Sequence, residues 1–375
     1  MIYLDYAATT PLDGEVKAAM ERAFAAWGNP SAVHAYGRAA KALLEESHER
    51  VARALGARPR EIVFTSGGTE ADALAVYGVA LARGRGHLVT SQIEHSAVLT
   101  AMKGLERLGY AVSYLTPEPR TGLIYPEQVA EALRPDTLLV SLMTVNNELG
   151  TVYPVREVVE VCKARGVLFH TDAVQAAGTL PLEVKELGAD LLSLAAHKFY
   201  GPKGAGALYV RKGLELFPLA PGKQEQGLRG GTENLPAVYG LGLALERAVA
   251  LLPQETPRLL ALRERLEAAL LALPGVELNG HPTARSPKHV NVTALGADGE
   301  GLLLNLDLMG VAASSGSACA SGSLEPSHVL TAIGRSKAEA RASVRFSLGR
   351  HTTEAEIDEA ARIFAQAVER SRGPA

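Results

Sequence analysis

A lysine and an aspartate near the middle of the 375-residue chain have the residue types and the setting for carbonyl chemistry. Lys198 follows an apolar run and the small residues Ala195 and Ala196, and it precedes a turn rich in glycine and proline. Because burial lowers the pKa of an amine, Lys198 is expected to be a nucleophile that can hold an aldehyde cofactor as a Schiff base. Asp172 ends a neighbouring apolar run and can pair with a pyridinium nitrogen, so the two residues predict pyridoxal phosphate chemistry. The alternative is that Lys198 is an ordinary surface lysine.

Two turns that combine glycine with threonine are candidates for binding a phosphate. Residues 66–70, S-G-G-T-E, join an expected strand to a helix, so the amides near Gly68 and the hydroxyl of Thr69 can face an anion. Residues 230–234, G-G-T-E-N, contain Thr232 and precede a long helix. The alternative for both turns is an ordinary helix cap. The stretch G-P-K-G-A-G after Lys198 lacks the G-K-[ST] ending, so a nucleotide P-loop is rejected.

Four polar residues follow expected strands, where they can meet the same ligand. His95 opens a helix and can lie over a cofactor ring and move protons, although a lone histidine is more often structural. Asn147 follows the strand expected at 137–144, and its alternative is a turn asparagine. Gln175 and His197 lie close in sequence to the aspartate and the lysine.

One of the two cysteines has a setting that suggests reactivity. Cys319 lies within residues 314–323, S-S-G-S-A-C-A-S-G-S, a stretch that cannot bury much apolar area and is expected to be mobile. A thiol there can act as a nucleophile that moves between two places; the alternative is a linker cysteine. Cys162 lies in a helical pattern and is expected to be an inert core thiol. Two thiols do not make a disulfide framework, and no metal-ligand set is predicted.

The composition describes a soluble globular protein. The chain is 47% hydrophobic and 21% charged with a net charge of -3, so neither general nucleic-acid binding nor membrane binding is expected. The first residues, M-I-Y-L-D-Y, lack the basic and apolar regions of a secretory signal, and a cytoplasmic location is expected.

The elements that must position these residues alternate between strand and helix. Short apolar strands predict a mostly parallel, seven-stranded sheet of the α/β class with helices on both faces, and ligands bind beyond the carboxyl ends of such strands. A helical region from about 235 to 273, expected to break at Pro253, leads to a smaller α+β domain. The expected divisions are an N-terminal segment that joins the small domain, a large cofactor-binding domain and a small domain that carries Cys319: 1–14, 15–250 and 251–375.

Ten motifs, taken in order over nearly the whole chain, resemble one family. They are L-D-Y-A-A-T-T-P, G-N-P-S-A-V-H, E-I-V-F-T-S-G-G-T-E, I-E-H-S-A-V-L, V-N-N-E-L-G, H-T-D-A-V-Q, H-K-F-Y-G-P-K-G-A-G-A-L-Y-V-R, R-G-G-T-E-N, S-S-G-S-A-C-A-S-G-S-L-E-P-S-H-V-L and V-R-F-S-L-G-R. The set resembles the pyridoxal-phosphate-dependent cysteine desulfurases of the branch that supplies sulfur for iron–sulfur clusters. This resemblance implies a fold-type I aminotransferase architecture and a homodimer.

The resemblance also implies roles for individual residues. Lys198 would form the Schiff base, and the other cofactor ligands would be Gly68, Thr69, His95, Asn147, Asp172, Gln175, His197 and Thr232 of the partner subunit. Substrate would be held by Asn29, Asn147 and Arg345. The catalytic residues would be Lys198, His95 and Cys319, with Cys319 as the sulfur acceptor.

The implied reaction converts L-cysteine to L-alanine and leaves the sulfur as a persulfide on Cys319, for delivery to a cluster scaffold or another acceptor. The chain departs from the resemblance at two points. Ala195 stands where the family often has a phosphate-binding serine, and the C-terminus is shorter than in relatives that dock a scaffold through their last residues. The alternatives are a selenocysteine lyase or another β-lyase, an aminotransferase on the same fold, and a non-catalytic sulfur carrier.

Overall fold

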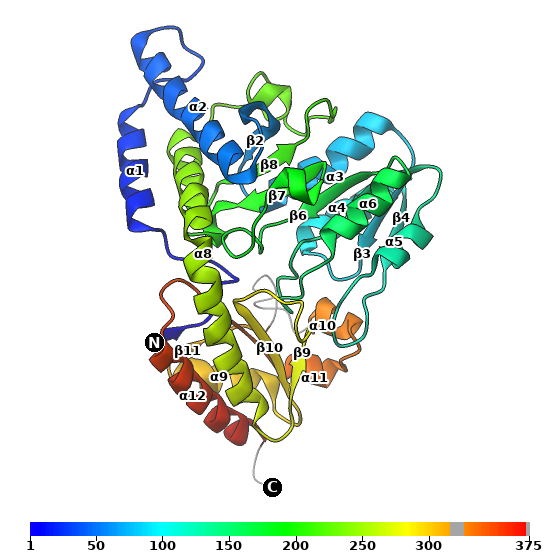
Figure 1. Cartoon of the computed structure of the whole chain (residues 1–375), viewed down its shortest axis with the longest axis vertical. Coiled ribbons are helices and arrows are strands. Elements are labelled where there is room, and N and C mark those ends of the chain that lie inside the picture. Colours follow the sequence, from blue (N-terminus) through cyan, green and yellow to red (C-terminus); the bar gives the residue numbers. More distant parts are fainter. Residues whose placement is uncertain (316–325, 373–375) are drawn as a thin grey trace.

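The computed structural model describes residues 1–315 and 326–372, and it has two parts joined by one long helix. The larger part is built on a seven-stranded sheet and the smaller part on a three-stranded sheet (Figure 1). Helix α8 (Leu235–Leu271) runs from one part into the other.

The seven-stranded sheet has the order β2-β8-β7-β6-β5-β3-β4. Its strands are β2 (Ile62–Thr65), β3 (His87–Ser91), β4 (Ala111–Leu115), β5 (Thr137–Ser141), β6 (Leu168–Asp172), β7 (Leu191–Ala195) and β8 (Gly206–Val210). Only β8 runs against its neighbours within this sheet. The inner strands are buried along their length, which is typical of a sheet covered on both faces. The mostly parallel, seven-stranded α/β sheet is therefore confirmed.

Helices cover both faces of this sheet, and alternate residues of a strand face opposite layers. Leu191 packs in the core formed with α3 (Gly68–Arg83) and α4 (Ser96–Arg107). Its neighbour Leu192 packs in the core formed with α2 (Ala35–Leu55) and the first half of α8. The remaining helices of this part are α1 (Gly14–Ala25), α5 (Pro126–Ala132), α6 (Val155–Ala164) and α7 (Val184–Leu187).

The smaller part combines an antiparallel sheet with helices. Its sheet has the order β12-β10-β9, formed by β9 (Val276–Asn279), β10 (His289–Ala294) and β12 (Ser343–Ser347). The helices are α9 (Gly299–Leu308), α10 (His328–Ala332), α11 (Lys337–Arg341) and α12 (Glu354–Arg372). The start of the chain joins this part, because β1 (Ile2–Tyr3) pairs in parallel with β11 (Val311–Ala312).

Helix α8 continues through Pro253 and Pro257, so the expected break at Pro253 is wrong. A proline inside a helix removes a hydrogen bond and costs about 3 kcal/mol. Packing outweighs that cost here, because the residues before the prolines are buried in the large core and those after them in the small core. By length and composition α8 could cross a membrane, but 56% of its most apolar window is buried inside the protein, as in a core helix.

The second half of α8 generates a stability prediction. Leu266 is fully buried in the small core, whereas Leu260 on the same helix is exposed. Leu266→Ala should lower the free energy of unfolding by about 2–5 kcal/mol, because it deletes buried methyl groups and leaves a cavity. Leu260→Ala is the matched control and should change it by less than about 1 kcal/mol. Denaturant unfolding followed by circular dichroism measures both, and equal effects would contradict the assignment of this core.

Candidate active site

The predicted site residues converge on a cavity of about 240 Å³ at the carboxyl edge of the large sheet. Asp172 is the last residue of β6 and Ala195 the last of β7. The cavity is lined by Ala7, Ala8, Gly68, Thr69, Asp72, His95, Met143, Val145, Asn147, Asp172, Val174, Gln175, Ala195, His197, Lys198 and Arg345. This is the edge at which parallel α/β sheets bind ligands.

Lys198 lies in the short turn that follows β7 and is held by the start of the chain. Its Nζ donates hydrogen bonds to the carbonyl oxygens of Ala7 (2.6 Å) and Ala8 (2.8 Å). These contacts, which join residues 190 positions apart, aim the amine at the cavity. The sequence reasoning identified Lys198 but not the segment that holds it.

Asp172 ends β6 and His95 follows β3, two strands that flank β5 in the sheet, and both residues line the cavity. Burial raises the pKa of Asp172, and nearby His95 and Lys198 oppose that rise. Burial lowers the pKa of His95, and its Nδ1 accepts the backbone N–H of Ala97 at 3.2 Å as the cap of α4. We therefore assign His95 as a neutral imidazole that carries its proton on Nε2. The site thus offers a carboxylate, an amine and a neutral ring donor.

The N-terminus of α3 forms the predicted phosphate cradle. A Cβ on Gly68 would lie 3.0 Å from Cγ2 of Val174, so the close approach here favours glycine. Thr69 is exposed beside it, and the amides of the first helical turn favour an anion. His197 contacts Oγ1 of Thr9 at 3.1 Å, and burial lowers its pKa to about 4, so it is neutral. Ala195 lines the cavity without a side-chain donor.

Arg345, from the smaller part of the molecule, also lines the cavity. It lies on β12, is 2% exposed, and donates to the carbonyl oxygen of Asn147 and to Oδ1 of Asp5, both at 2.8 Å. Its Nε has no hydrogen-bond partner among the described residues. The two contacts fix the guanidinium and leave Nε as an unpartnered donor for a ligand such as a carboxylate.

Other buried polar atoms in the cavity also lack partners within the described ranges. They are Oδ1 of Asn147, Oε1 of Gln175 and Oδ1 of Asp72. Unsatisfied buried acceptors are rare in folded proteins and indicate a missing partner. The lysine, the aspartate, the amide oxygens and the helix N-terminus fit the aldehyde, the ring nitrogen, the ring hydroxyl and the phosphate of pyridoxal phosphate.

Asp72 is a cavity residue that sequence reasoning missed. It lies four positions after Gly68 on α3, so helical spacing could have placed it on the same face. Its carboxylate is 3.6 Å from Nε2 of His170, and burial together with Asp172 raises its pKa. His170 contacts the hydroxyls of Ser141 and Ser193, and burial lowers its pKa to about 3. A neutral, hydrogen-bonded layer therefore supports the strand ends.

Asn29 and Thr232 are the two predicted residues that the chain does not bring to its own cavity. Both are exposed, and Oδ1 of Asn29 accepts the N–H of Ser31 at 2.8 Å. Residues 30–33, 223–225 and 233 line one surface hollow, so the two predicted residues lie on neighbouring loops.

Of the two thiols, only Cys162 falls within the described residues; Cys319 lies outside them. Cys162 is buried on α6, and burial raises its pKa to about 12, so it is an inert core thiol. The chain leaves the described region beside the cavity, because Ser314 pairs with the backbone of Arg345 at 2.7 and 3.2 Å. It returns where Ser327 donates to the buried carboxylate of Glu148.

Comparison with known proteins agrees with this geometry. The family model for class-V aminotransferases matches residues 2–360. The chain is 46% identical to a cysteine desulfurase IscS of Dictyoglomus turgidum over 377 aligned residues, covering 99% of this chain and 95% of that protein. It is 47% identical to a cysteine desulfurase IscS of Methanosarcina thermophila, covering 99% and 93%. The chain belongs to the cysteine desulfurase family of class-V aminotransferases.

Solved structures of similar proteins place this class-V aminotransferase in the fold-type I group. A NifS-like protein superposes with a TM-score of 0.91 at 34% identity, covering 98% of this chain and 99% of that one. A structure described as SspA in complex with cysteine gives 0.83 at 40% identity, covering 94% and 100%. The desulfurase uses pyridoxal 5'-phosphate as its cofactor.

The turn that precedes α3 generates a prediction about cofactor affinity. A Cβ on Gly206 of β8 would lie 2.5 Å from the carbonyl carbon of Gly67, so Gly206→Ala must displace the backbone of the phosphate cradle. We expect pyridoxal phosphate to bind Gly206→Ala at least about tenfold more weakly, a loss of about 1.4 kcal/mol. Gly14→Ala, where a Cβ meets nothing within 4 Å, is the control. Cofactor titration by absorbance measures both, and unchanged affinity in Gly206→Ala would refute this role of the turn.

Proposed function

We propose that the protein is a cysteine desulfurase that converts L-cysteine to L-alanine and transfers the sulfur to Cys319 as a persulfide. The observation that carries the proposal is the cavity in which Lys198 and Asp172 lie with the buried, partly unpaired guanidinium of Arg345. Relatives named cysteine desulfurase match 99% of the chain, which supports the same conclusion.

Different residues of the cavity would hold different groups of the cofactor. Lys198 would hold the aldehyde, Asp172 the ring nitrogen, and Gln175 and Asn147 the ring hydroxyl. His95 would lie against the ring, while the first turn of α3 and His197 hold the phosphate. When bound, pyridoxal phosphate withdraws electrons from the α-carbon of an attached amino acid.

Arg345 binds and orients the substrate. Asp5 and the carbonyl of Asn147 each accept from one terminal nitrogen, and the unpartnered Nε can donate to the carboxylate of L-cysteine. Because both terminal nitrogens of Arg345 are already held, its side chain loses little conformational entropy when the substrate binds. The substrate is therefore fixed by one part of the molecule and the cofactor by the other.

Lys198 moves the proton. The carbonyls of Ala7 and Ala8 keep its Nζ at the cavity wall, within reach of a substrate α-carbon. With the cofactor and the substrate bound, the unprotonated amine of Lys198 would take the α-proton of the substrate. Neutral His95 is a donor at the opposite side of the same cavity.

Sulfur transfer uses a thiolate from Cys319. Its sulfur forms an S–S bond with the substrate sulfur as the Cβ–S bond of the substrate breaks, and the electron pair of that bond stays on the substrate carbon. Protonation of Cβ then gives alanine, so L-cysteine and one protein thiol become L-alanine and one protein persulfide. Burial raises the pKa of Cys162 to about 12, so that residue cannot compete.

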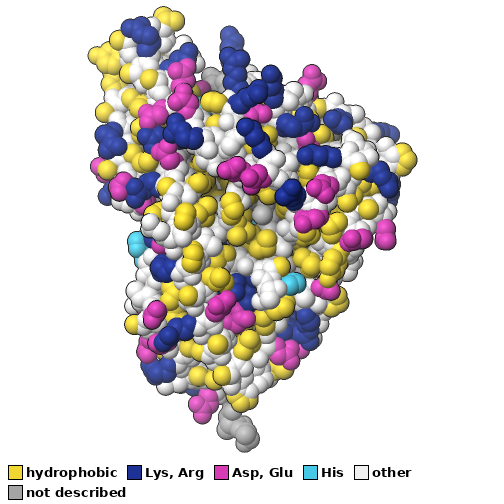
Figure 2. All heavy atoms as spheres, viewed as in Figure 1, with side chains coloured by type: hydrophobic (Ala, Val, Ile, Leu, Met, Phe, Trp, Pro, Cys, Tyr) yellow, Lys and Arg dark blue, Asp and Glu magenta, His cyan; other side chains and the backbone are white. Residues whose placement is uncertain are grey.

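A homodimer completes the proposed site. Val33 (88% exposed) and Trp27 (73% exposed) carry apolar area into solvent at the protruding end of α1 and α2, at the upper left of Figures 1 and 2. Exposed apolar patches on a folded protein mark interaction sites. Asn29 lies on the same loop and Thr232 on the loop beside it, which supports the proposal that they serve the site of the second copy. We place the enzyme in the cytoplasm, with a cluster scaffold or another thiolation acceptor as the destination of the sulfur.

Cys319→Ala should abolish alanine and sulfide formation from L-cysteine, because it removes the proposed sulfur acceptor, while the absorbance of the bound cofactor stays unchanged. Cys162→Ala is the matched control and should keep most of the activity. Mass spectrometry after L-cysteine addition should show a persulfide on Cys319 in the wild type and in Cys162→Ala. Desulfuration that persists in Cys319→Ala would exclude the persulfide route and favour a lyase that needs no thiol.

Trp27→Asp should shift the protein towards the monomer, because it places a charge in the proposed apolar contact. Leu308→Asp alters an equally exposed leucine on α9 and should leave the oligomeric state unchanged. Sedimentation velocity of the cofactor-loaded proteins measures the effect. A wild-type monomer, or a Trp27→Asp variant that remains a dimer, would contradict this interface.

A further inference from the structure

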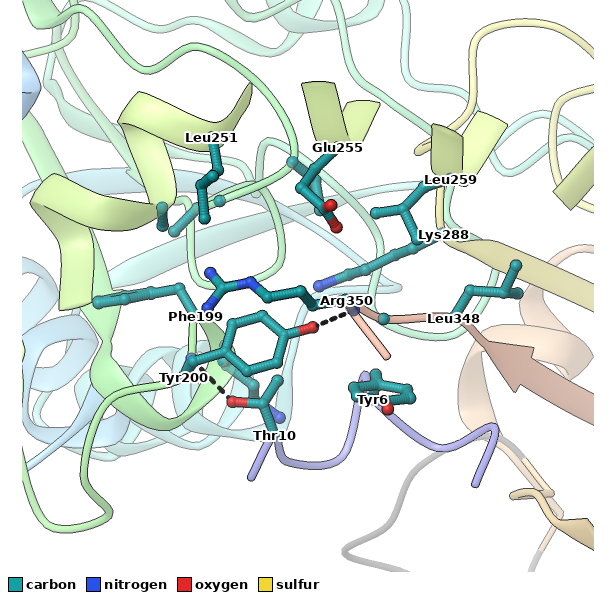
Figure 3. Close-up of a pocket in the computed structure, with 16 residues that line it drawn as sticks. Tyr6, Thr10, Phe199, Tyr200, Leu251, Glu255, Leu259, Lys288, Leu348 and Arg350 are labelled. Carbon is teal, nitrogen blue, oxygen red and sulfur yellow. Dashed lines mark hydrogen bonds between the residues drawn. The ribbon is translucent and has the colours of Figure 1, made fainter. Parts of the chain in front are cut away.

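Lys198 lines the proposed cofactor pocket and also a second, smaller cavity, of which Figure 3 is a close-up. This cavity lies where the N-terminal segment, α8 and the end of β12 meet the turn after β7. Its volume is about 20 Å³, which is room for little more than a water molecule and too small for an organic ligand. We call it the rear cavity. Because it is too small for an organic ligand, any role it has depends on the side chains that line it.

A second lysine faces the rear cavity. Lys288 precedes β10, is 3% exposed, and directs its amine into the space between Arg350 and Glu255 in Figure 3. Within the described ranges its Nζ makes no hydrogen bond or ion pair. An amine this deeply buried is rare unless it is paired, so this position needs an explanation.

The acidic groups near Lys288 are paired with other cations. Glu255 accepts two hydrogen bonds from Arg258, at 2.9 and 3.3 Å. Asp13 accepts from Arg350 at 2.7 Å, and Asp5 accepts from Arg345. The titratable and charged side chains that face Lys288 are Tyr6, Lys198, Tyr200, Glu255, Arg345 and Arg350. Its sequence neighbour His289 is buried and has a strongly lowered pKa, to which Lys288 contributes.

The electrostatic balance at Lys288 is unfavourable for its own charge. Burial, together with the smaller effects of the positive charges of Lys198 and Arg345, lowers its pKa from 10.5 to about 7. Such an interaction acts equally on both partners, so a proton on Lys288 disfavours a proton on Lys198. On the other side of Lys198, the carboxylate of Asp172 attracts positive charge to it.

We propose that Lys288 is a positioning residue for the reaction, whose amine behind Lys198 opposes the pull of Asp172 and keeps Lys198 unprotonated when it must attack a carbonyl or accept the α-proton. The inference rests on the proposed function. The rear cavity then has a role that needs no ligand. It holds the amine of Lys288, from the small part of the molecule, where its charge disfavours a proton on Lys198, from the large part. A neighbouring cation is a known way to make a lysine nucleophilic.

The test is a pH titration of the cofactor-loaded protein, without L-cysteine, followed by the visible absorbance of the Schiff base at Lys198. In Lys288→Met the pKa of that nitrogen should rise by on the order of one pH unit, because one nearby charge is lost. Lys288→Arg keeps the charge and should stay at or below the wild-type value. An unchanged titration in Lys288→Met overturns the proposal. Because no L-cysteine is present, this outcome is separate from whether the protein desulfurates cysteine.

Thermal unfolding of the same variants distinguishes this role from a structural one. Since the pKa of Lys288 falls on folding, the unfolded chain binds more protons between about pH 7 and 10.5, and wild-type stability gains from this group as pH rises through that range. Lys288→Met retains the packing of the stem and should melt higher than the wild type at pH 7, with a difference that shrinks towards pH 10. A lower melting temperature at pH 7 would mean that Lys288 has a stabilising partner, and it would overturn the proposal.

Discussion

The site depends on holding an amine and a carboxylate at the carboxyl edge of a buried sheet without letting them neutralise each other. Asp172 ends β6, Lys198 lies in the turn after the adjacent strand β7, and burial raises the cost of charging the carboxyl group. The carbonyls of Ala7 and Ala8 anchor the amine, and the backbone N–H of Val174 holds the carboxylate. The space between them is the proposed cofactor pocket.

The second constraint is that the pocket is shared between the two parts of the molecule. Arg345 belongs to the small sheet but is oriented by Asp5 and by the carbonyl of Asn147 from the large one. Helix α8 fixes this arrangement because it is buried in both cores. Packing thus couples the proposed substrate-binding arginine to the proposed cofactor residues and fixes their relative geometry.

Arg345 and Lys288, the two buried cations that the small part contributes, differ in how their charges are compensated. Arg345 is compensated by Asp5, whereas the charged side chains around Lys288 in the described part of the chain are other cations and the already paired Glu255. A protein retains an uncompensated buried amine at a cost in stability. The proposed benefit is that Lys288 helps Lys198 to lose its proton at neutral pH, as catalysis by an amine requires.

The sequence by itself determined the elements and the chemistry, because strand and helix periods, glycine caps such as Gly56 and ordered motifs are local signals. It identified Lys198, Asp172 and Arg345, but it wrongly ended a helix at Pro253, where burial at both ends outweighs the local penalty. It missed Asp72 and Lys288, and it gave no hint that Ala7 and Ala8 hold the catalytic amine. Only tertiary structure decides such contacts, because they join residues far apart in the chain and depend on which faces pack together.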